Sequence, residues 1–119
     1  MIVDAVLGDE RAVARLAYGV LHAPVSIDAE FLHALRRQWV SGRIDDARAH
    51  TALRLFSGRR IIRHPISHMV ERMWSLRQNV SAYDAGYVAL AESLNLTLIT
   101  RDRRLSRSSG HTARIEYID

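Results

Sequence analysis

The stretch NVSAYDAGYVALAESLNLTLIT, residues 79–100, decides the fold because it joins a capped helix to a buried strand. Ser81 precedes an apolar helical pattern, and Asp84 follows it at the spacing of an S-x-x-D/E capping box. Asp84 also lies at the end of the helix where the helix dipole favours a negative charge. Helix capping is therefore a sufficient local explanation of Asp84, and a catalytic role is the alternative. The apolar run LTLIT that follows predicts a buried strand.

The rest of the chain repeats this alternation of strands and helices. We expect strands at residues 1–4, 23–27, 60–64, 96–100 and 113–118. We expect helices at about residues 10–18, 28–40 with Asp28 as its cap, 45–57, 65–74 beginning at Pro65, and 81–94, and a short helical turn from Asp102. Strands separated by helices predict an α/β fold with a mostly parallel central sheet flanked by helices. We therefore expect one domain over residues 1–119.

The composition restricts the chemistry and the compartment. The 119 residues are 48% hydrophobic, which is enough for an ordinary core. There is no cysteine, so disulfides and thiolate metal sites are excluded, and a reducing cytosol suits the chain. No apolar stretch has the length of a membrane span, and the first residues do not form a signal peptide. We expect a cytoplasmic protein without a membrane partner.

The basic residues are all arginine, and the formal net charge is +4. The absence of lysine excludes a P-loop nucleotide site and Schiff-base chemistry. Arginine suits bidentate phosphate recognition, although coding bias explains the composition equally well. Arg101, Arg103 and Arg104 flank Asp102 and are weak candidates for holding RNA phosphate, with a solvated charge run as the alternative. No basic patch interleaved with aromatic residues is visible in the sequence.

Four carboxylates occupy strand-to-helix junctions of the predicted sheet. Asp4 ends the first strand, Glu30 and Asp84 open helices, and Asp102 follows LTLIT. Each has an ordinary explanation alone, but junctions at the carboxyl ends of parallel strands share one edge of the sheet. At about 4 Å each pair of such charges costs roughly 4 kcal/mol at an effective dielectric of 20, so a hard cation would stabilise the cluster. All-oxygen ligation favours Mg²⁺ or Mn²⁺, and phosphodiester hydrolysis is the use we expect.

The segments IVDA, APVSIDAEFLHALRR, NVSAYDAGYVALAESLNLTLITRDRRL and GHTARIEYI occur in this order. Together they resemble the PIN-domain toxins of bacterial VapBC toxin–antitoxin pairs over nearly the whole chain. The resemblance implies a metal-dependent endoribonuclease that cuts particular RNAs. It also implies inhibition by a VapB-like antitoxin whose tail occupies the site, and a homodimer. By position, the acidic quartet falls on Asp4, Glu30, Asp84 and Asp102. Thr100 corresponds to the supporting hydroxyl residue of the family, and we add Ser81 as a second supporting residue.

The chain departs from the family pattern directly after Asp4. Relatives continue with a small residue, a hydroxyl residue and an apolar helix, whereas DAVLGDE reaches Gly8 and Asp9 almost at once. We therefore expect a first helix that is shorter by more than one turn. This departure keeps a second hypothesis open, in which the chain is a degenerate PIN domain that binds proteins and has no catalytic activity.

Two other features are weaker candidates. His64 and His68 have the i, i+4 spacing of a metal site, but Pro65 places His64 outside the helix, so we do not expect a paired zinc site. The helical hairpin from Asp28 to Phe56 carries Trp39 and could offer apolar surface to a partner. For that hairpin we take burial within the domain as the default expectation.

Overall fold

The computed structural model describes residues 5–8, 11–12 and 19–119, which form an α/β domain around a five-stranded parallel sheet. Its strands are β1 (Ala5–Leu7), β2 (Leu21–Pro24), β3 (Ile61–His64), β4 (Leu98–Thr100) and β5 (Ile115–Tyr117). The strand order is β3-β2-β1-β4-β5, and all four neighbouring pairs are parallel. The predicted fold class is confirmed.

The chain reverses its direction of travel across the sheet between β1 and β4. It runs outward from β1 to β3 and then returns to the other side of β1 for β4 and β5. Gly8, directly after β1, donates its N–H to the Ile99 carbonyl at 2.5 Å. A Cβ atom at Gly8 would lie 2.6 Å from Cβ of Thr100, so this close approach requires glycine. Such a switch point, at the carboxyl ends of the strands, is where parallel sheets bind ligands.

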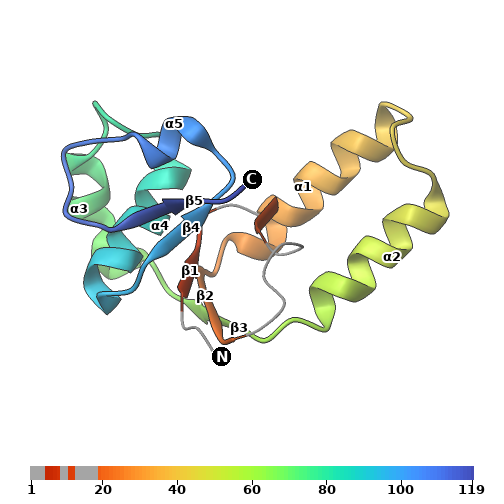
Figure 1. The fold of residues 1–119 in the computed structure, drawn as a ribbon, viewed down its shortest axis with the longest axis horizontal. Helices are drawn as coiled ribbons and strands as arrows, with labels where there is room; N and C mark the ends of the chain where they lie inside the picture. The colour runs from red at the N-terminus through yellow and green to blue at the C-terminus, as the bar shows by residue number, and fades with distance from the viewer. Residues whose placement is uncertain (1–4, 9–10, 13–18) are drawn as a thin grey trace.

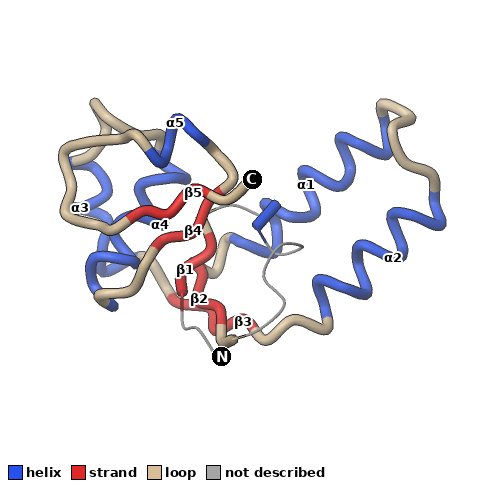
Figure 2. The backbone as a smooth tube through the Cα atoms, in the orientation of Figure 1, coloured by secondary structure: helices blue, strands red, loops and turns tan. Residues whose placement is uncertain are grey.

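The helices are α1 (Ile27–Val40), α2 (Asp46–Ser57), the 3₁₀ turn η2 (Ser67–Met69), α3 (Val70–Ser75), α4 (Ala82–Leu94) and α5 (Arg103–Ser106). Helix α4 packs across β1, β2 and β4, and α3 packs on α4. Helix α5 packs on β4 and β5. The sheet, α3, α4 and α5 thus form one body, and α1 and α2 extend from it as a hairpin (Figures 1 and 2).

The core lies where α4 meets the sheet. Residues 85–91 of α4 are all buried, as their apolar run predicts. They pack in one cluster with Val6, Leu21 and Leu98 of the strands. Within the described residues, no helix combines the length and the hydropathy needed to cross a bilayer.

The α1–α2 hairpin leaves much of its apolar surface in solvent. Phe31 and Phe56 stack between the two helices with ring centroids 4.0 Å apart, and Phe56 is buried. In contrast, Trp39 is 50% exposed and Leu55 is 64% exposed. The default expectation of burial is therefore wrong for Trp39, because the hairpin extends away from the sheet instead of packing on it.

Four sequence-based boundaries are wrong. The second strand does not cover residues 23–27, because β2 is Leu21–Pro24 and α1 already begins at Ile27. The first strand does not end at Asp4, because β1 continues to Leu7. Asp28 does not cap α1: Ser26 is the N-cap residue, and Asp28 forms an ion pair with Arg63 at 2.6 Å that lowers its pKa. Pro65 does not begin a helix, since the chain passes through η2 before α3 begins at Val70.

The remaining boundaries agree with the predictions or fall outside the described residues. Asp45 caps α2, and Gly58 follows its end. Ser81 caps α4, and Asp102 caps α5. Most of the helix expected at residues 10–18 lies outside the described residues, as does Asp4.

Candidate active site

Asp84 is placed by the N-terminal turn of α4. The Ser81 side chain accepts a hydrogen bond from the Asp84 backbone N–H at 3.2 Å, which is the N-cap contact that the sequence predicts. The cap fixes the first turn of a helix whose next residues are buried against the sheet. The Asp84 carboxylate is therefore held at a defined position beside the carboxyl ends of the strands.

Asp102 is placed by the end of β4 and the start of α5. Its Oδ1 accepts hydrogen bonds from the backbone N–H groups of Arg104 at 2.9 Å and Leu105 at 3.4 Å. Its own N–H donates to Oγ1 of Thr100 at 3.0 Å, and Thr100 is fully buried. Thr100 thus supports the position of Asp102 from inside the sheet.

Asp84 and Asp102 line one cavity of about 530 Å³. One wall comes from the segment between α3 and α4, and the other comes from the β4–α5 junction. The residues that complete the lining are Arg77, Gln78, Asn79, Val80, Ser81, Arg104 and Leu105. The cavity therefore combines two carboxylates with two guanidinium groups. That mixture can hold a cation and a phosphate group next to each other.

Glu30 belongs to a neighbouring hollow on the other side of the first turn of α4. Its Oε2 accepts hydrogen bonds from the Ser26 hydroxyl at 2.7 Å and from the Tyr87 hydroxyl at 3.1 Å. Tyr83, the residue before Asp84, lines this hollow together with Glu30. Tyr87 lies one helical turn after Asp84 on the same face of α4. The first turn of α4 thus contributes a lining residue to each hollow, Asp84 to one and Tyr83 to the other.

The described carboxylates fit a hard divalent cation, although they do not complete a ligand set. Among the described residues, no three His, Asp or Glu side chains lie close enough to hold a metal ion. Mg²⁺, however, is commonly bound through one or two carboxylates, with water and substrate phosphate as its other ligands. Asp84 and Asp102 in one cavity match that chemistry. Asp4, the remaining quartet member, lies outside the described residues.

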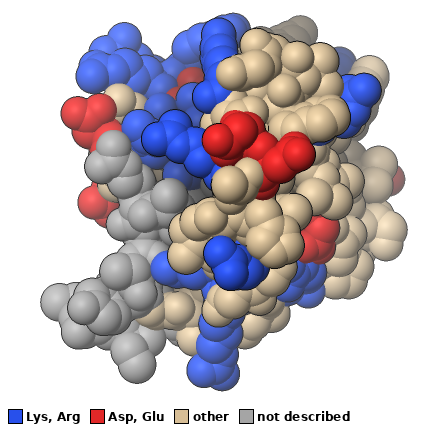
Figure 3. Space-filling view, turned by 90° about the vertical axis from the view of Figure 1, so that its right-hand side faces the viewer, with Lys and Arg blue, Asp and Glu red and all other residues tan. Residues whose placement is uncertain are grey.

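The arginines that flank Asp102 have different positions. Arg104 lines the cavity that contains Asp84 and Asp102, and Arg103, the residue before it in sequence, is exposed. Arg101 lines a different cavity, between α1 and α2. In Figure 3, arginine side chains spread over the face shown, with acidic groups between them. The charges on that face are thus mixed and do not form a single basic stripe.

Sequence reasoning missed Arg77, Asn79 and Tyr87. Arg77 and Asn79 lie in an irregular segment, where no periodicity indicates which side chains face a cavity. A Cβ atom at Gly110, whose φ is +88°, would overlap the Asn79 side chain, so Asn79 packs closely on the loop before β5. For Tyr87 a signal existed, because it shares a helix face with Asp84.

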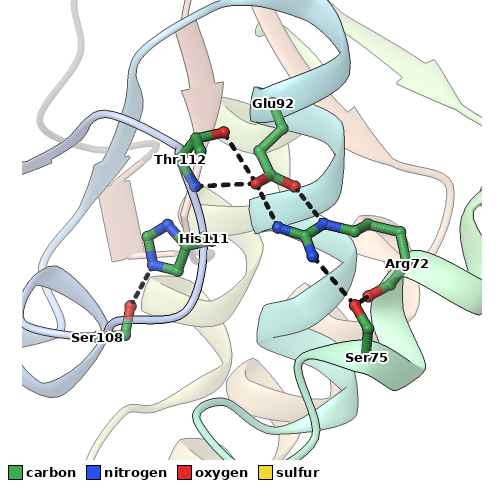
Figure 4. Close-up of polar contacts among 6 residues, drawn as sticks. All are labelled: Arg72, Ser75, Glu92, Ser108, His111 and Thr112. Carbon is green, nitrogen blue, oxygen red and sulfur yellow. Dashed lines mark hydrogen bonds and ion pairs between the residues drawn. The ribbon is translucent and has the colours of Figure 1, made fainter.

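The far end of α4 carries another carboxylate, which is fully engaged. Both Glu92 oxygens are bound by the Arg72 guanidinium at 2.9 and 2.7 Å, and Oε2 also accepts from the backbone N–H and the hydroxyl of Thr112 (Figure 4). Arg72 also donates to Ser75 in α3. The Arg72 guanidinium, followed by the two Thr112 hydrogen bonds, lowers the pKa of Glu92 to about 2. This network ties α3 and the loop before β5 to α4.

Comparison with known proteins identifies the family. The family model for the PIN domain matches residues 1–110. Ribonuclease VapC9 of Mycobacterium tuberculosis is 42% identical over 86% of this chain and 80% of its own length. Ribonuclease VapC1 of the same species is 39% identical over 98% of this chain and 92% of its own length. The crystal structure of PAE2754 from Pyrobaculum aerophilum superposes with a TM-score of 0.69 and 27% identity, covering 95% of this chain and 92% of that one. The chain therefore belongs to the PIN-domain family and is of the VapC type.

Proposed function

We propose that this chain is a Mg²⁺- or Mn²⁺-dependent endoribonuclease toxin that hydrolyses RNA phosphodiester bonds. The observation that carries the proposal is the cavity shared by Asp84 and Asp102, with Arg77 and Arg104 in its walls. The names of the VapC relatives, which are ribonucleases, support RNA as the substrate. The carboxylates supply oxygen ligands for a hard cation, and the arginines supply donors for phosphate oxygens.

Each quartet residue has a role in this proposal. Asp4, Glu30, Asp84 and Asp102 hold the metal directly or through water, and one of them orients or deprotonates the attacking water. When bound, the cation activates that water and stabilises the charge that builds on the phosphate. Thr100 and Ser81 fix Asp102 and Asp84, and Ser26 and Tyr87 hold the Glu30 carboxylate. Arg104 contacts the substrate phosphate, with smaller contributions from Arg101 and Arg103.

The partner in this proposal is a VapB-like antitoxin in the cytoplasm, whose tail occupies the site. Apolar surface on the hairpin supports a protein partner, because Leu32, Val40 and Leu55 are each more than half exposed. A cavity of about 450 Å³ between α1 and α2, lined in part by Phe31 and Phe56, adds to that surface. We also propose that the chain forms a homodimer, and analytical ultracentrifugation of the purified protein measures its mass directly.

Cleavage of total RNA by the purified chain tests the catalytic proposal. The reaction is run with Mn²⁺ or Mg²⁺, beside samples that contain EDTA and beside the variants Asp84→Asn and Asp102→Asn. Asparagine preserves the shape of aspartate and still caps a helix, so both variants should fold. Discrete fragments with the wild-type chain, absent in EDTA and in both variants, are the expected result.

A folded wild-type chain that leaves RNA intact with either metal contradicts the proposal. Circular dichroism and a cooperative thermal transition establish folding in the same sample. That outcome favours the catalytically inactive protein-binding domain, with the shortened segment after Asp4 as the first feature to restore. Cleavage that persists in EDTA would instead contradict the metal requirement.

A further inference from the structure

A cavity of about 550 Å³ on the outer part of α1 is lined by four arginines. Arg36 and Arg37 belong to the C-terminal half of α1. Arg43 lies in the turn after that helix, and Arg11 lies in the segment that follows β1. Among the described residues, no carboxylate lines this cavity, which we call the arginine hollow. Its remaining lining residues are Ala34, Gln38, Val40 and Ser41.

The positive charge of the arginine hollow has no counter-charge nearby in the sequence. Residues 31–44 contain no Asp or Glu. The helix dipole favours Arg37, which lies in the last turn of α1, but Arg11 and Arg43 lie outside that helix. Within the part of the chain that the structure describes, the three arginines of α1 and its turn form no ion pair. Because clefts lined by charges of one sign attract ions of the opposite sign, we expect an anionic ligand.

The first carboxylates after this stretch, Asp45 and Asp46, have other partners. Asp45 caps α2 and accepts a hydrogen bond from the Arg48 backbone N–H at 2.9 Å. Asp46 accepts a hydrogen bond from the indole N–H of Trp39 at 2.6 Å. Neither carboxylate lines the arginine hollow. The hollow therefore keeps its positive character, although α2 begins close to it in the sequence.

The arginine hollow adjoins the candidate site through shared and neighbouring residues. Arg37 and Ala34 line the arginine hollow and also the hollow of Glu30. Tyr83 lines the Glu30 hollow, and the next residue, Asp84, lines the cavity that it shares with Asp102, here called the acidic cavity. The rise of an α-helix places Arg37 about 10 Å from Glu30 along the axis of α1. A long anion at the acidic cavity can thus continue past Glu30 to the arginines.

A ligand with several regularly spaced negative charges fits this arrangement. Arginine binds phosphate oxygens through paired hydrogen bonds, and contacts to phosphates position a nucleic acid without reading its sequence. We infer that the arginine hollow is a second RNA-binding site, which holds backbone phosphates of an RNA whose cleaved phosphate lies at the acidic cavity. The inference rests on the proposed function, because it takes the acidic cavity as the place of cleavage. The continuity with that cavity favours RNA over an acidic peptide, which the test below also examines.

Two RNA substrates of different length test the inference. The long RNA has about 20 nucleotides around a mapped cleavage position, and the short RNA has about four, so that it offers few phosphates beyond the acidic cavity. The test variant combines Arg36→Gln with Arg43→Gln. Arg37 is left in place because it also lines the Glu30 hollow. The matched control combines Arg54→Gln with Arg60→Gln, two exposed arginines that line none of the three hollows.

Two measurements are made on each protein. The kcat and KM for both RNAs are determined with Mn²⁺. The affinity for the fluorescein-labelled long RNA is determined by anisotropy in EDTA over a series of salt concentrations, so that binding is measured without cleavage. Poly-glutamate is titrated in the same way as a competitor, because it presents negative charges without phosphate. Circular dichroism establishes that each variant is folded.

The expected result is a loss of affinity that depends on RNA length. The Arg36→Gln, Arg43→Gln variant should raise KM for the long RNA about tenfold and leave kcat within about twofold, because the arginines contact the RNA away from the reacting phosphate. Both constants should stay within about twofold of wild type for the short RNA. The slope of log affinity against log salt should become shallower by about one to two, as for the loss of two phosphate contacts. The control variant should change each quantity by less than about twofold.

Equal KM of wild type and the test variant for the long RNA, with both folded, would overturn the inference. So would equal losses with the two RNAs, or an equal loss in the control variant, which would indicate a general effect of charge. Unchanged RNA affinity together with weaker competition by poly-glutamate would assign the hollow to an acidic protein instead. The proposed function is judged separately, by Mn²⁺-dependent cleavage in the wild-type chain. Cleavage that is independent of Arg36 and Arg43 rejects only the second RNA-binding site, and arginine-dependent binding in EDTA without cleavage rejects only catalysis.

Discussion

The two ends of α4 carry carboxylates in opposite circumstances. At the N-terminal end, Asp84 lines a cavity together with Asp102 and two arginines. At the C-terminal end, Glu92 is bound on both oxygens by Arg72 and Thr112, in a network that joins α3 and the loop before β5 to the helix. The helix dipole favours a negative charge at the first position and disfavours one at the second.

The difference separates two uses of the same chemical group. Glu92 lies at the unfavourable end of α4, and its ion pair with Arg72 compensates for that position, so we assign it to stability. Asp84 lies at the favourable end and lines the cavity that it shares with Asp102, so we assign it to the proposed site. The general lesson is that the role of a carboxylate is best inferred from the groups that bind its oxygens and from whether it lines a cavity. Its place in a motif is a weaker guide.

Substituting Asp84 should have the largest effect, and the effect should fall on activity. Asp84→Asn is expected to lower RNA cleavage at least about a hundredfold, because it removes a metal-binding charge. The melting temperature should change little, since Ser81 caps the helix through the Asp84 backbone N–H, which asparagine retains. Cleavage rates and thermal melts of the same preparation measure both quantities. A much lower melting temperature of the variant would instead assign Asp84 to stability, as Glu92 is.

The N-terminal carboxylate of the quartet should behave like Asp84, and a comparison of two aspartates identifies it. The family resemblance selects Asp4, but β1 ends at Leu7, so Asp9 is the first carboxylate after that strand in the sequence. Asp4→Asn should lower cleavage at least about tenfold, and Asp9→Asn should change it less than about threefold. The reverse order, measured in the same cleavage assay, would transfer the role of Asp4 to Asp9.

The sequence was a reliable guide to features that depend on neighbouring residues. Ser81 was predicted as a cap, and Asp102 as the start of a short helical turn, because an N-cap contact spans only two or three residues, and both contacts are present. The strands at 60–64 and 96–100 were predicted for the same reason, since apolar runs bounded by turns are local signals.

Features that depend on distant residues were not predictable in this way. Tyr87 contacts Glu30 across 57 positions, and Arg72 contacts Glu92 across 20. Asp28 has the pattern of a cap, yet Arg63 of β3 engages its carboxylate instead. Such partners are chosen by the packing of helices on the sheet, and a pattern within a short window contains no information about that packing.

Tyr87 holds the Glu30 carboxylate, and removing its hydroxyl should have an intermediate effect. Tyr87→Phe deletes the hydrogen bond to Glu30 and keeps the buried ring in place. The loss of one hydrogen bond to a charged group corresponds to about 1–2 kcal/mol, so we expect cleavage to fall about five- to thirtyfold at limiting Mn²⁺. Saturating Mn²⁺ should restore part of the activity if Glu30 helps to hold the metal. Equal losses at all Mn²⁺ concentrations would contradict that role.

Glu92→Gln should have the smallest effect on catalysis and a measurable effect on stability. The variant is expected to unfold more easily by about 1–2 kcal/mol at neutral pH, because the charge-assisted bonds to Arg72 are lost, and to cleave RNA within twofold of wild type. The pKa of Glu92 is about 2 in the folded chain against 4.5 for a free side chain. Its contribution is therefore complete above pH 4.5 and is lost as the pH falls towards 2.

Urea denaturation at a series of pH values checks this prediction. The difference between wild type and Glu92→Gln should be constant from neutral pH down to about pH 5 and should shrink below it. A partner control is Arg72→Gln, which should reproduce the loss at neutral pH and leave little further loss in the double variant. A difference that persisted undiminished at the lowest pH would mean that packing, and not the carboxylate charge, holds this end of α4.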